Sequence, residues 1–187
     1  MYLPVLISVF AFSMIPGAFA DFEEDMLNEH NRLRRLHGSP DLQLIPFIPQ
    51  EIRNYARNVT VEDRELPYIQ SYPLSTCKTL GDPLNCVQHW YDEIKYYDFN
   101  KPGFSDKTKY FTALVWKSST SLAVLMDTNP DSNNKYVFAT YYPLGNIDGQ
   151  FEENVPKPNG SFPSGNLFQI NIVIVLLYSW FISKTLA

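Results

Sequence analysis

Residues 111–142 read FTALVWKSSTSLAVLMDTNPDSNNKYVFATYY, and this stretch decides the fold class. Two of its segments, 111–116 and 122–126, are rich in β-branched, aromatic and aliphatic residues, and a third such segment spans 135–142. Clusters of Lys, Ser, Thr, Asn, Asp and Pro separate the three segments, as is typical of turns between antiparallel strands. We therefore predict three short strands, with 111–116 covered on both faces because it is apolar throughout.

The residues before this stretch predict helices. Apolar side chains recur at three- and four-residue steps over 22–37, and Gly38 then ends the run. A second helix is expected to begin at Pro49, because proline is favoured at the first helical position, and a third spans about residues 85–97. Residues 63–86 show no clear period and are predicted as loop. Helices first and antiparallel strands after them predict an α+β domain with helices packed on the sheet.

The first 20 residues differ from the rest of the chain. They form an apolar run that closes on the sequence AFA at 18–20, and the acidic segment 21–25 follows at once. An apolar stretch closed by small residues is the layout of a cleaved secretory signal peptide, so residues 1–20 are predicted to be one. The alternative is a buried N-terminal helix, which Pro4 and Pro16 disfavour because a helix interior tolerates proline poorly.

A second apolar run, 167–182, lies near the other end of the sequence. It is short for a membrane-spanning helix, which needs about 20 apolar residues. A glycosylphosphatidylinositol (GPI) attachment signal needs small residues at the cleavage site, a polar spacer and about 10–20 apolar residues. We predict attachment at Asn159, a domain over 21–157, and the spacer and signal over 158–187. A genuine membrane helix, or neither role, are the alternatives.

Charge and cysteine content narrow the function classes. The net charge is −5, the pI is about 5.1, and no basic stripe occurs, so nucleic acid is not an expected partner. The only cysteines, Cys77 and Cys86, predict one disulfide in an oxidising compartment, because two ligands do not make a metal site. The sequon at Asn58 predicts N-glycosylation. A second sequon coincides with the anchor site at Asn159, which can serve only one of the two uses.

Several local sequence patterns within residues 22–157 resemble those of one known family and follow the same order along the chain as in that family. They are HNxxRxxHGxPxL at 30–42, WYDEI at 90–94, NKPGF at 100–104, FTALVWK at 111–117, YYPLGNI at 141–147 and FEENV at 151–155. In these segments the chain resembles the CAP superfamily (cysteine-rich secretory proteins, antigen 5, pathogenesis-related 1). It is most similar to the cysteine-poor subgroup typified by the Golgi-associated plant pathogenesis-related protein. The resemblance implies a three-layer α-β-α sandwich with a short antiparallel sheet.

The resemblance also implies a cleft, which it places at Glu93 and Tyr110. Many CAP members line this cleft with two histidines and two glutamates that can hold a metal such as zinc. Of the four, Glu93 alone survives: Tyr110 and Pro67 stand where the histidines are usual, and the segment with the other glutamate is missing. No metal and no cofactor are therefore expected. His89, one turn before Glu93, is a conceivable substitute ligand, but an exposed helix residue is the simpler interpretation.

The other two histidines, His30 and His37, fit the family's first helix, where buried and hydrogen-bonded rings are expected. No Gly-x-Ser-x-Gly elbow or nucleophile–base arrangement occurs, so the chain is not expected to be an enzyme. We predict a non-catalytic, secreted or surface-anchored protein that binds another protein at the cell surface, as a monomer or a homodimer. Sterol or fatty-acid binding, lined by aromatic residues within 96–104, is the alternative. A metal-dependent or hydrolytic enzyme, with Glu93 and Tyr110 paired for proton transfer, is the least favoured interpretation.

Overall fold

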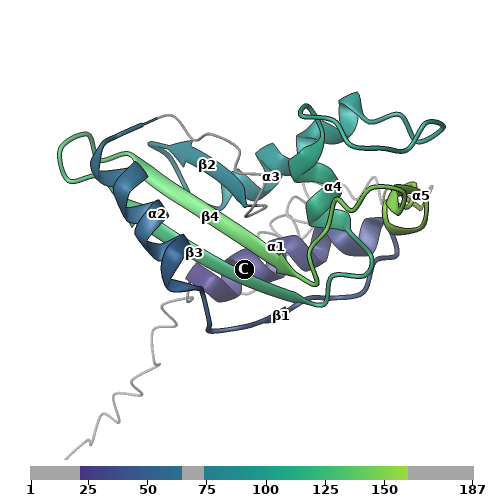
Figure 1. Ribbon diagram of the computed structural model, residues 1–187, viewed down its shortest axis with the longest axis horizontal. Helices are drawn as coiled ribbons and strands as arrows, with labels where there is room; N and C mark the ends of the chain where they lie inside the picture. The colour runs from purple at the N-terminus through teal and green to yellow at the C-terminus, as the bar shows by residue number, and fades with distance from the viewer. Residues whose placement is uncertain (1–21, 65–73, 160–187) are drawn as a thin grey trace, which may run out of the picture.

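Helices cover both faces of a four-stranded sheet in the computed structural model, whose described residues are 22–64 and 74–159 (Figure 1). The predicted signal peptide and the C-terminal apolar run lie outside these residues. The fold is the predicted α+β, three-layer α-β-α sandwich. In chain order the elements are α1 (Phe22–Leu36), β1 (Gln43–Leu44), α2 (Gln50–Val61), β2 (Ser75–Thr79), α3 (Asn85–Tyr91), the 3-10 helix η1 (Asp92–Tyr96), α4 (Lys109–Val115), β3 (Ser121–Thr128), β4 (Lys135–Tyr142) and α5 (Phe151–Asn154).

The sheet has the strand order β1-β3-β4-β2. β3 and β4 form a long antiparallel hairpin in which Ser121 lies opposite Tyr142, and β2 pairs antiparallel with the other edge of β4. β1 pairs in parallel with the beginning of β3, with Gln43–Leu44 beside Ser121–Leu122. The sheet is therefore mixed, not wholly antiparallel as predicted, because residues 43–44, between the first two predicted helices, add one short parallel strand.

Each face of the sheet has its own hydrophobic core, because successive strand residues point to opposite sides. Leu122 and Val124 of β3 belong to the larger core, which includes residues of α1, α3 and α4. Ala123 and Leu125 belong to the smaller core, which α2 covers. In Figure 1, α2 lies across one face of the β3–β4 hairpin and α1 lies behind the other. Alternate side chains of β3 thus pack against helices on opposite faces of the sheet.

The segment 111–116 is a helix, so its prediction as a strand is wrong. Lys109–Val115 form α4, in which Phe111, Leu114 and Val115 are completely buried. A short run that is apolar on every side does not distinguish a buried strand from a buried helix, because neither period is visible in it. The choice depends instead on contacts with distant residues, which cap and anchor α4 as described below.

The predicted loop over 63–86 contains a strand. Its residues 75–79 read STCKT and form β2, whose main chain pairs with β4 although its side chains are mostly polar. Cys77 of β2 and Cys86 at the start of α3 are joined by a disulfide. The disulfide joins residues nine positions apart in the sequence. Closing so short a loop is expected to stabilise the fold by about 2–3 kcal/mol, because it lowers the entropy of the unfolded chain. The three predicted helices are confirmed, with Pro49 at the N-cap of α2 and the third helix continuing into η1.

Candidate functional site

Glu93 lies on η1, and its carboxylate caps the first turn of α4. Its Oε2 accepts hydrogen bonds from the backbone N–H groups of Tyr110 (2.8 Å) and Phe111 (3.1 Å). Burial raises the pKa of Glu93, while the two backbone hydrogen bonds lower it in part. The first N–H groups of a helix have no partner within the helix, and a carboxylate is favourable beside them. Glu93 therefore supplies the helix cap that α4 lacks from its own residues.

Tyr110 lies beside Glu93, but its hydroxyl bonds to a different residue. It pairs with the Thr76 hydroxyl of β2 (2.9 Å), and the Trp90 indole N–H donates to the Thr76 carbonyl oxygen (3.0 Å). Burial raises the pKa of Tyr110. The structure thus brings Glu93 and Tyr110 together through the backbone of Tyr110, and the hydroxyl–carboxylate pair considered for proton transfer does not form between them.

His30 on α1 and His37 in the turn directly after it are buried, and both ring nitrogens of each are hydrogen-bonded, which confirms the expectation for these residues. Burial lowers the pKa of His30 to about 4 and also lowers that of His37. Both rings are therefore neutral at pH 7 and serve as internal connections between helices and neighbouring segments. Their partners are Met26 O (2.6 Å) and Tyr141 OH (3.0 Å) for His30, and Pro156 O (2.6 Å) and Tyr91 OH (3.0 Å) for His37.

The described residues do not fit the zinc site that the family resemblance implies. His89 is exposed on α3, and Pro67 lies outside the described ranges. Within residues 22–64 and 74–159, no group of three or more His, Cys, Asp or Glu side chains is placed to hold a metal ion. A zinc site needs at least three such ligands, whereas Glu93 is already bonded to two N–H groups. The described residues of this cleft therefore do not supply enough ligands for a zinc ion.

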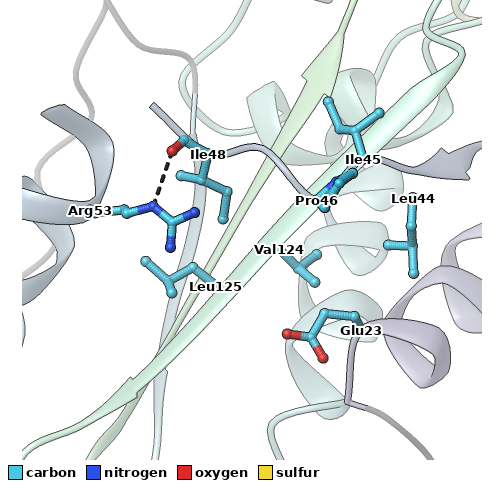
Figure 2. Close-up of a pocket in the computed structure, with 8 residues that line it drawn as sticks. All are labelled: Glu23, Leu44, Ile45, Pro46, Ile48, Arg53, Val124 and Leu125. Atoms are coloured by element: carbon cyan, nitrogen blue, oxygen red, sulfur yellow. Dashed lines mark hydrogen bonds between the residues drawn. The ribbon is translucent and has the colours of Figure 1, made fainter. Parts of the chain in front are cut away.

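A pocket of about 370 Å³ opens at the edge of the sheet, away from Glu93 (Figure 2). Its walls are the apolar segment 44–48 and the side chains of Val124 and Leu125 on β3, with Glu23 of α1 and Arg53 of α2 at its sides. The Arg53 guanidinium donates to the Ile48 carbonyl oxygen (3.1 Å), which holds the segment against α2. The lining is mainly apolar with one acidic and one basic side chain, a composition that suits an apolar group carried by a polar molecule.

The aromatic residues proposed for a lipid site do not share one surface. Tyr97 packs edge-on against Phe99 (4.9 Å between ring centroids), and both pack against Phe111 in the larger core. Tyr96 and Phe104 are 61% and 44% exposed. Two of the four side chains therefore belong to the core and two to the surface.

Sequence reasoning missed the edge pocket, although one signal for it was present. Residues 45–49 read IPFIP, an apolar run with two prolines between predicted elements. Connecting segments usually run over the surface and are mostly polar, so an apolar one there indicates either a core contact or a binding surface. Ile48 is buried, while Pro46 and Phe47 are exposed, so this segment has both roles.

Known proteins are similar to this chain in sequence and in fold. The family model described as "CAP: Cysteine-rich secretory protein family" matches residues 27–142. Human Golgi-associated plant pathogenesis-related protein 1 is 32% identical over 154 residues, which cover 76% of this chain and 97% of that protein. Protein PRY2 of Saccharomyces cerevisiae is 30% identical over 140 residues, which cover 72% of this chain but only 41% of PRY2. The chain therefore spans less than half the length of this second relative.

Solved structures agree on the fold. The hookworm platelet inhibitor superposes with a TM-score of 0.53 at 19% identity, covering 71% of this chain and 75% of that one. Schistosoma mansoni venom allergen-like protein 4 gives a TM-score of 0.51 at 17% identity, with 73% and 95% covered. At such identities the likeness concerns the fold alone. Together with the match over residues 27–142, these findings show that the chain belongs to the CAP, or cysteine-rich secretory protein, family.

Proposed function

We propose that this protein is a non-catalytic CAP-domain binding protein of the secretory pathway, displayed at the cell surface, where it engages another protein. The observation that carries the proposal is that the polar side chains expected in the family cleft are hydrogen-bonded to other parts of the same protein. Glu93 caps α4, the Tyr110 hydroxyl bonds to Thr76, and His30 and His37 are buried with both nitrogens bonded. These groups are used in hydrogen bonds within the fold, which supports a binding function over a catalytic one.

The surface around the edge pocket supports binding in place of catalysis. Phe47, in the segment that forms one wall, is 71% exposed, and Met126 on β3 is 37% exposed. Exposed apolar side chains next to an apolar pocket are typical of an interaction site. Phe47 lies between two residues that line the pocket, and Met126 follows a third, so we take the sheet edge and the segment 44–48 together as the candidate surface.

Several features support an extracellular, anchored location. Two Candida albicans relatives carry the names secreted protein RBT4 and secreted protein PRY1. The predicted anchor residue, Asn159, is exposed, and its backbone N–H donates to the Leu36 carbonyl oxygen at the end of α1 (2.8 Å). Glu23, which lines the pocket, lies at the other end of this 15-residue helix, roughly 20 Å away at 1.5 Å per residue. An anchor at Asn159 would leave the pocket remote from the attachment point.

The predicted glycan at Asn58 is compatible with this arrangement. Asn58 lies on the exposed side of α2, with Val59 turned into the smaller core. A glycan there would project into solvent and leave the packing of α2 on the sheet unchanged. Among the described residues, no helix is long and apolar enough to cross a membrane.

Sterol or fatty-acid binding remains a second candidate function, because the edge pocket has a mainly apolar lining. Its volume of about 370 Å³ lies near the lower end of the range for small-molecule sites, roughly 300–1,000 Å³.

A binding assay on intact cells distinguishes the two candidates. The full chain, recovered from expressing cells and labelled, is added to a panel of cell types before and after these are treated with protease. A protein partner predicts saturable binding that is lost after protease treatment. Binding that survives protease, together with retention of tritiated cholesterol or palmitate by the purified chain, would replace the proposal with the lipid alternative.

A matched pair of variants tests whether the candidate surface carries the binding. Phe47 and Val61 are both apolar and mostly exposed, at 71% and 60%, but Phe47 lies between the pocket residues Pro46 and Ile48, whereas Val61 ends α2. Phe47→Ser is expected to weaken cell binding at least several-fold, and Val61→Ser is expected to leave it unchanged. Equal effects of the two substitutions would show that the surface is elsewhere.

A further inference from the structure

β3 extends far beyond the short strand that pairs with it on its outer side. It spans Ser121–Thr128, whereas β1 covers only its first two residues. The Thr120 and Leu122 carbonyl oxygens accept from β1 and the segment after it, at 3.0 and 2.9 Å. In a strand the N–H and C=O groups of alternate residues point to the same edge. The main-chain groups of Val124 and Met126 must therefore point outward, beyond the end of β1.

The inner edge of β3 confirms this alternation. The Asn129 N–H donates to the Asn134 carbonyl oxygen (2.9 Å), which continues the ladder in which odd-numbered residues bond to β4. Thr128, the last even-numbered residue, donates its N–H to the Asp127 carboxylate instead. Among the described residues, no hydrogen bond reaches the outward N–H and C=O groups of Val124 and Met126. Within this part of the chain the β3 edge is thus left without a main-chain partner from Val124 to Met126; Val124 is only 5% exposed and lines the pocket, and Met126 is 37% exposed.

In its own sequence, and as far as residues 22–64 and 74–159 show, this open edge lacks the features that usually protect such a strand. Proteins block exposed edges with lysine, proline, bulges or a covering segment. Residues 121–128 contain no Lys, Arg or Pro, and their single charge is Asp127. The segment 44–48 departs from β3 after Ile45 and forms the far wall of the pocket, so the pocket lies beside the open main-chain groups (Figure 2).

We propose that the edge of β3 from Val124 to Met126 is a docking site for an extended polypeptide segment of a partner protein. The segment adds a strand to the sheet and inserts one apolar side chain into the pocket. Main-chain pairing supplies affinity in this mode of recognition, and the pocket supplies selectivity. The inference rests on the proposed function as a protein-binding module and names the chemistry of the partner. A sterol or fatty acid has no repeating donors and acceptors to match the strand.

Charge favours a foreign segment over a second copy of this chain. α1 begins with Glu23, Glu24 and Asp25, and Glu23 lines the pocket. Two-fold pairing of β3 with itself would bring two such acidic helix ends to one interface, between molecules that each carry a net charge of −5. Like charges brought together at an interface disfavour association. The expected partner segment is therefore extended, apolar at alternate positions, and neutral or basic.

A single-residue pair of variants isolates the edge donor. Met126 lies opposite Val137 at a position whose N–H points away from β4. Met126→Pro therefore removes an outward N–H without removing a β3–β4 hydrogen bond, whereas Met126→Val keeps the N–H and loses the same thioether. Random heptapeptides displayed on phage are selected on the full wild-type chain. The enriched peptides are expected to bind Met126→Val like wild type and Met126→Pro at least tenfold more weakly.

A second measurement keeps the proposal testable if Met126→Pro does not fold. The best enriched peptide is N-methylated at each residue in turn and bound to the wild-type chain. Strand pairing predicts loss of binding at every second residue only, because alternate amides face β3. Uniform sensitivity, no enriched peptide, or equal binding to the two variants would overturn the inference. A wild-type dimer that Met126→Pro dissociates would also overturn it, with a second copy as the occupant.

The same variants separate this inference from the proposed function. Protease-sensitive cell binding that is retained by Met126→Pro would leave the binding function standing and overturn the edge as its site. If the proposed function and this inference both hold, cell binding is lost in Met126→Pro and retained in Met126→Val. If no protease-sensitive binding occurs with the wild type, the proposed function fails regardless of the peptide data.

Discussion

Arg34 of α1 is completely buried, and four of its five N–H groups donate to main-chain oxygens. Burial lowers its pKa to about 10, so the guanidinium remains charged at pH 7. A buried charge is tolerated when it is hydrogen-bonded, and a planar guanidinium donates in several directions at once. This side chain joins α1 to the end of α4 and the start of β3. Its acceptors are the carbonyl oxygens of Pro40 (2.9 Å), Leu114 (2.8 Å), Trp116 (2.9 Å) and Ser119 (2.8 Å).

Arg34→Lys is expected to destabilise the fold although it keeps the charge. An ammonium cannot reach carbonyl oxygens spread over the guanidinium's plane, and each buried acceptor left without a donor costs about 1–3 kcal/mol. We expect the free energy of unfolding to fall by roughly 2–4 kcal/mol, measured by urea denaturation. Arg32→Lys is the control, because Arg32 forms an exposed ion pair with Glu29 and should change stability by less than about 1 kcal/mol. Equal losses in both variants would contradict this account.

His30 makes stability depend on pH in a defined window. Its pKa is about 4 in the folded state, against 6.5 for the ordinary side chain, because burial disfavours the charged ring. The unfolded chain therefore binds a proton first as the pH falls below 6.5, and stability falls between pH 6.5 and about 4. The loss is on the order of 3 kcal/mol, and the lowered pKa of His37 acts in the same direction. Melting temperatures at pH 7 and 4.5 should differ less in His30→Gln than in wild type. An unchanged difference would exclude His30 as the source.

At the scale of elements, α4 is a helix because distant residues hydrogen-bond to its N-terminal part. Glu93 bonds two N–H groups of its first turn. Asn146, from the turn after β4, donates to the Lys109 carbonyl oxygen (2.8 Å) and accepts from the Thr112 hydroxyl (2.6 Å). Asn146 has a φ of +59°, a conformation that asparagine adopts more readily than most residues. An element of seven residues depends on such tertiary contacts because short helices are marginal alone.

Two substitutions of Glu93 separate its capping role from any chemical one. Glu93→Ala removes the acceptor of two N–H groups and is expected to lower the free energy of unfolding by about 1–2 kcal/mol. Glu93→Gln keeps an acceptor oxygen and should remain within about 1 kcal/mol of wild type. The raised pKa of Glu93 means that its contribution is greatest below pH 4.5 and declines as the pH rises through its folded value. That decline should vanish in Glu93→Gln. A loss of cell binding in stable Glu93→Gln would contradict a purely structural role.

At the scale of the whole molecule, α1 runs between the predicted anchor residue and the edge pocket. Its last residues lie beside Asn159, the predicted anchor residue, and its first residues lie beside the edge pocket. If the chain is anchored at Asn159, as predicted, the edge pocket beside β3 therefore lies at the end of α1 remote from the attachment point. A partner on another cell or in the surrounding fluid could approach this edge without contacting the anchoring membrane.

Treatment of intact cells with phosphatidylinositol-specific phospholipase C tests the anchor. Cells that express the full chain should release it into the medium, because a GPI anchor is the only attachment that this enzyme cuts. Asn159→Gln is expected to reduce the released fraction, while Asn58→Gln should change only the mass of the glycosylated product. Surface protein that resists release would favour a membrane helix instead. Protein found in the medium before treatment would contradict anchoring altogether.

The amino-acid sequence by itself determined the features that depend on local pattern. The periodic apolar residues of α1, its end at Gly38 (φ +65°) and the β3–β4 hairpin agree with the structure. His30 and His37 lie at positions of a helix face that must be buried. Local period and turn chemistry are sufficient for these features because one face of each element meets the core and the other meets solvent.

Only the tertiary structure decided the features that depend on distant partners. The run at 111–116 is buried on every side, so the choice of helix came from Glu93 and Asn146. The polar sequence of β2 became a strand because the edge of β4 was available to it. The open edge of β3 exists because β1 ends after two residues, a length that no local period encodes. Main-chain hydrogen bonds are nearly alike for all residues, so which edges are paired and which stay open is set by the assembled sheet.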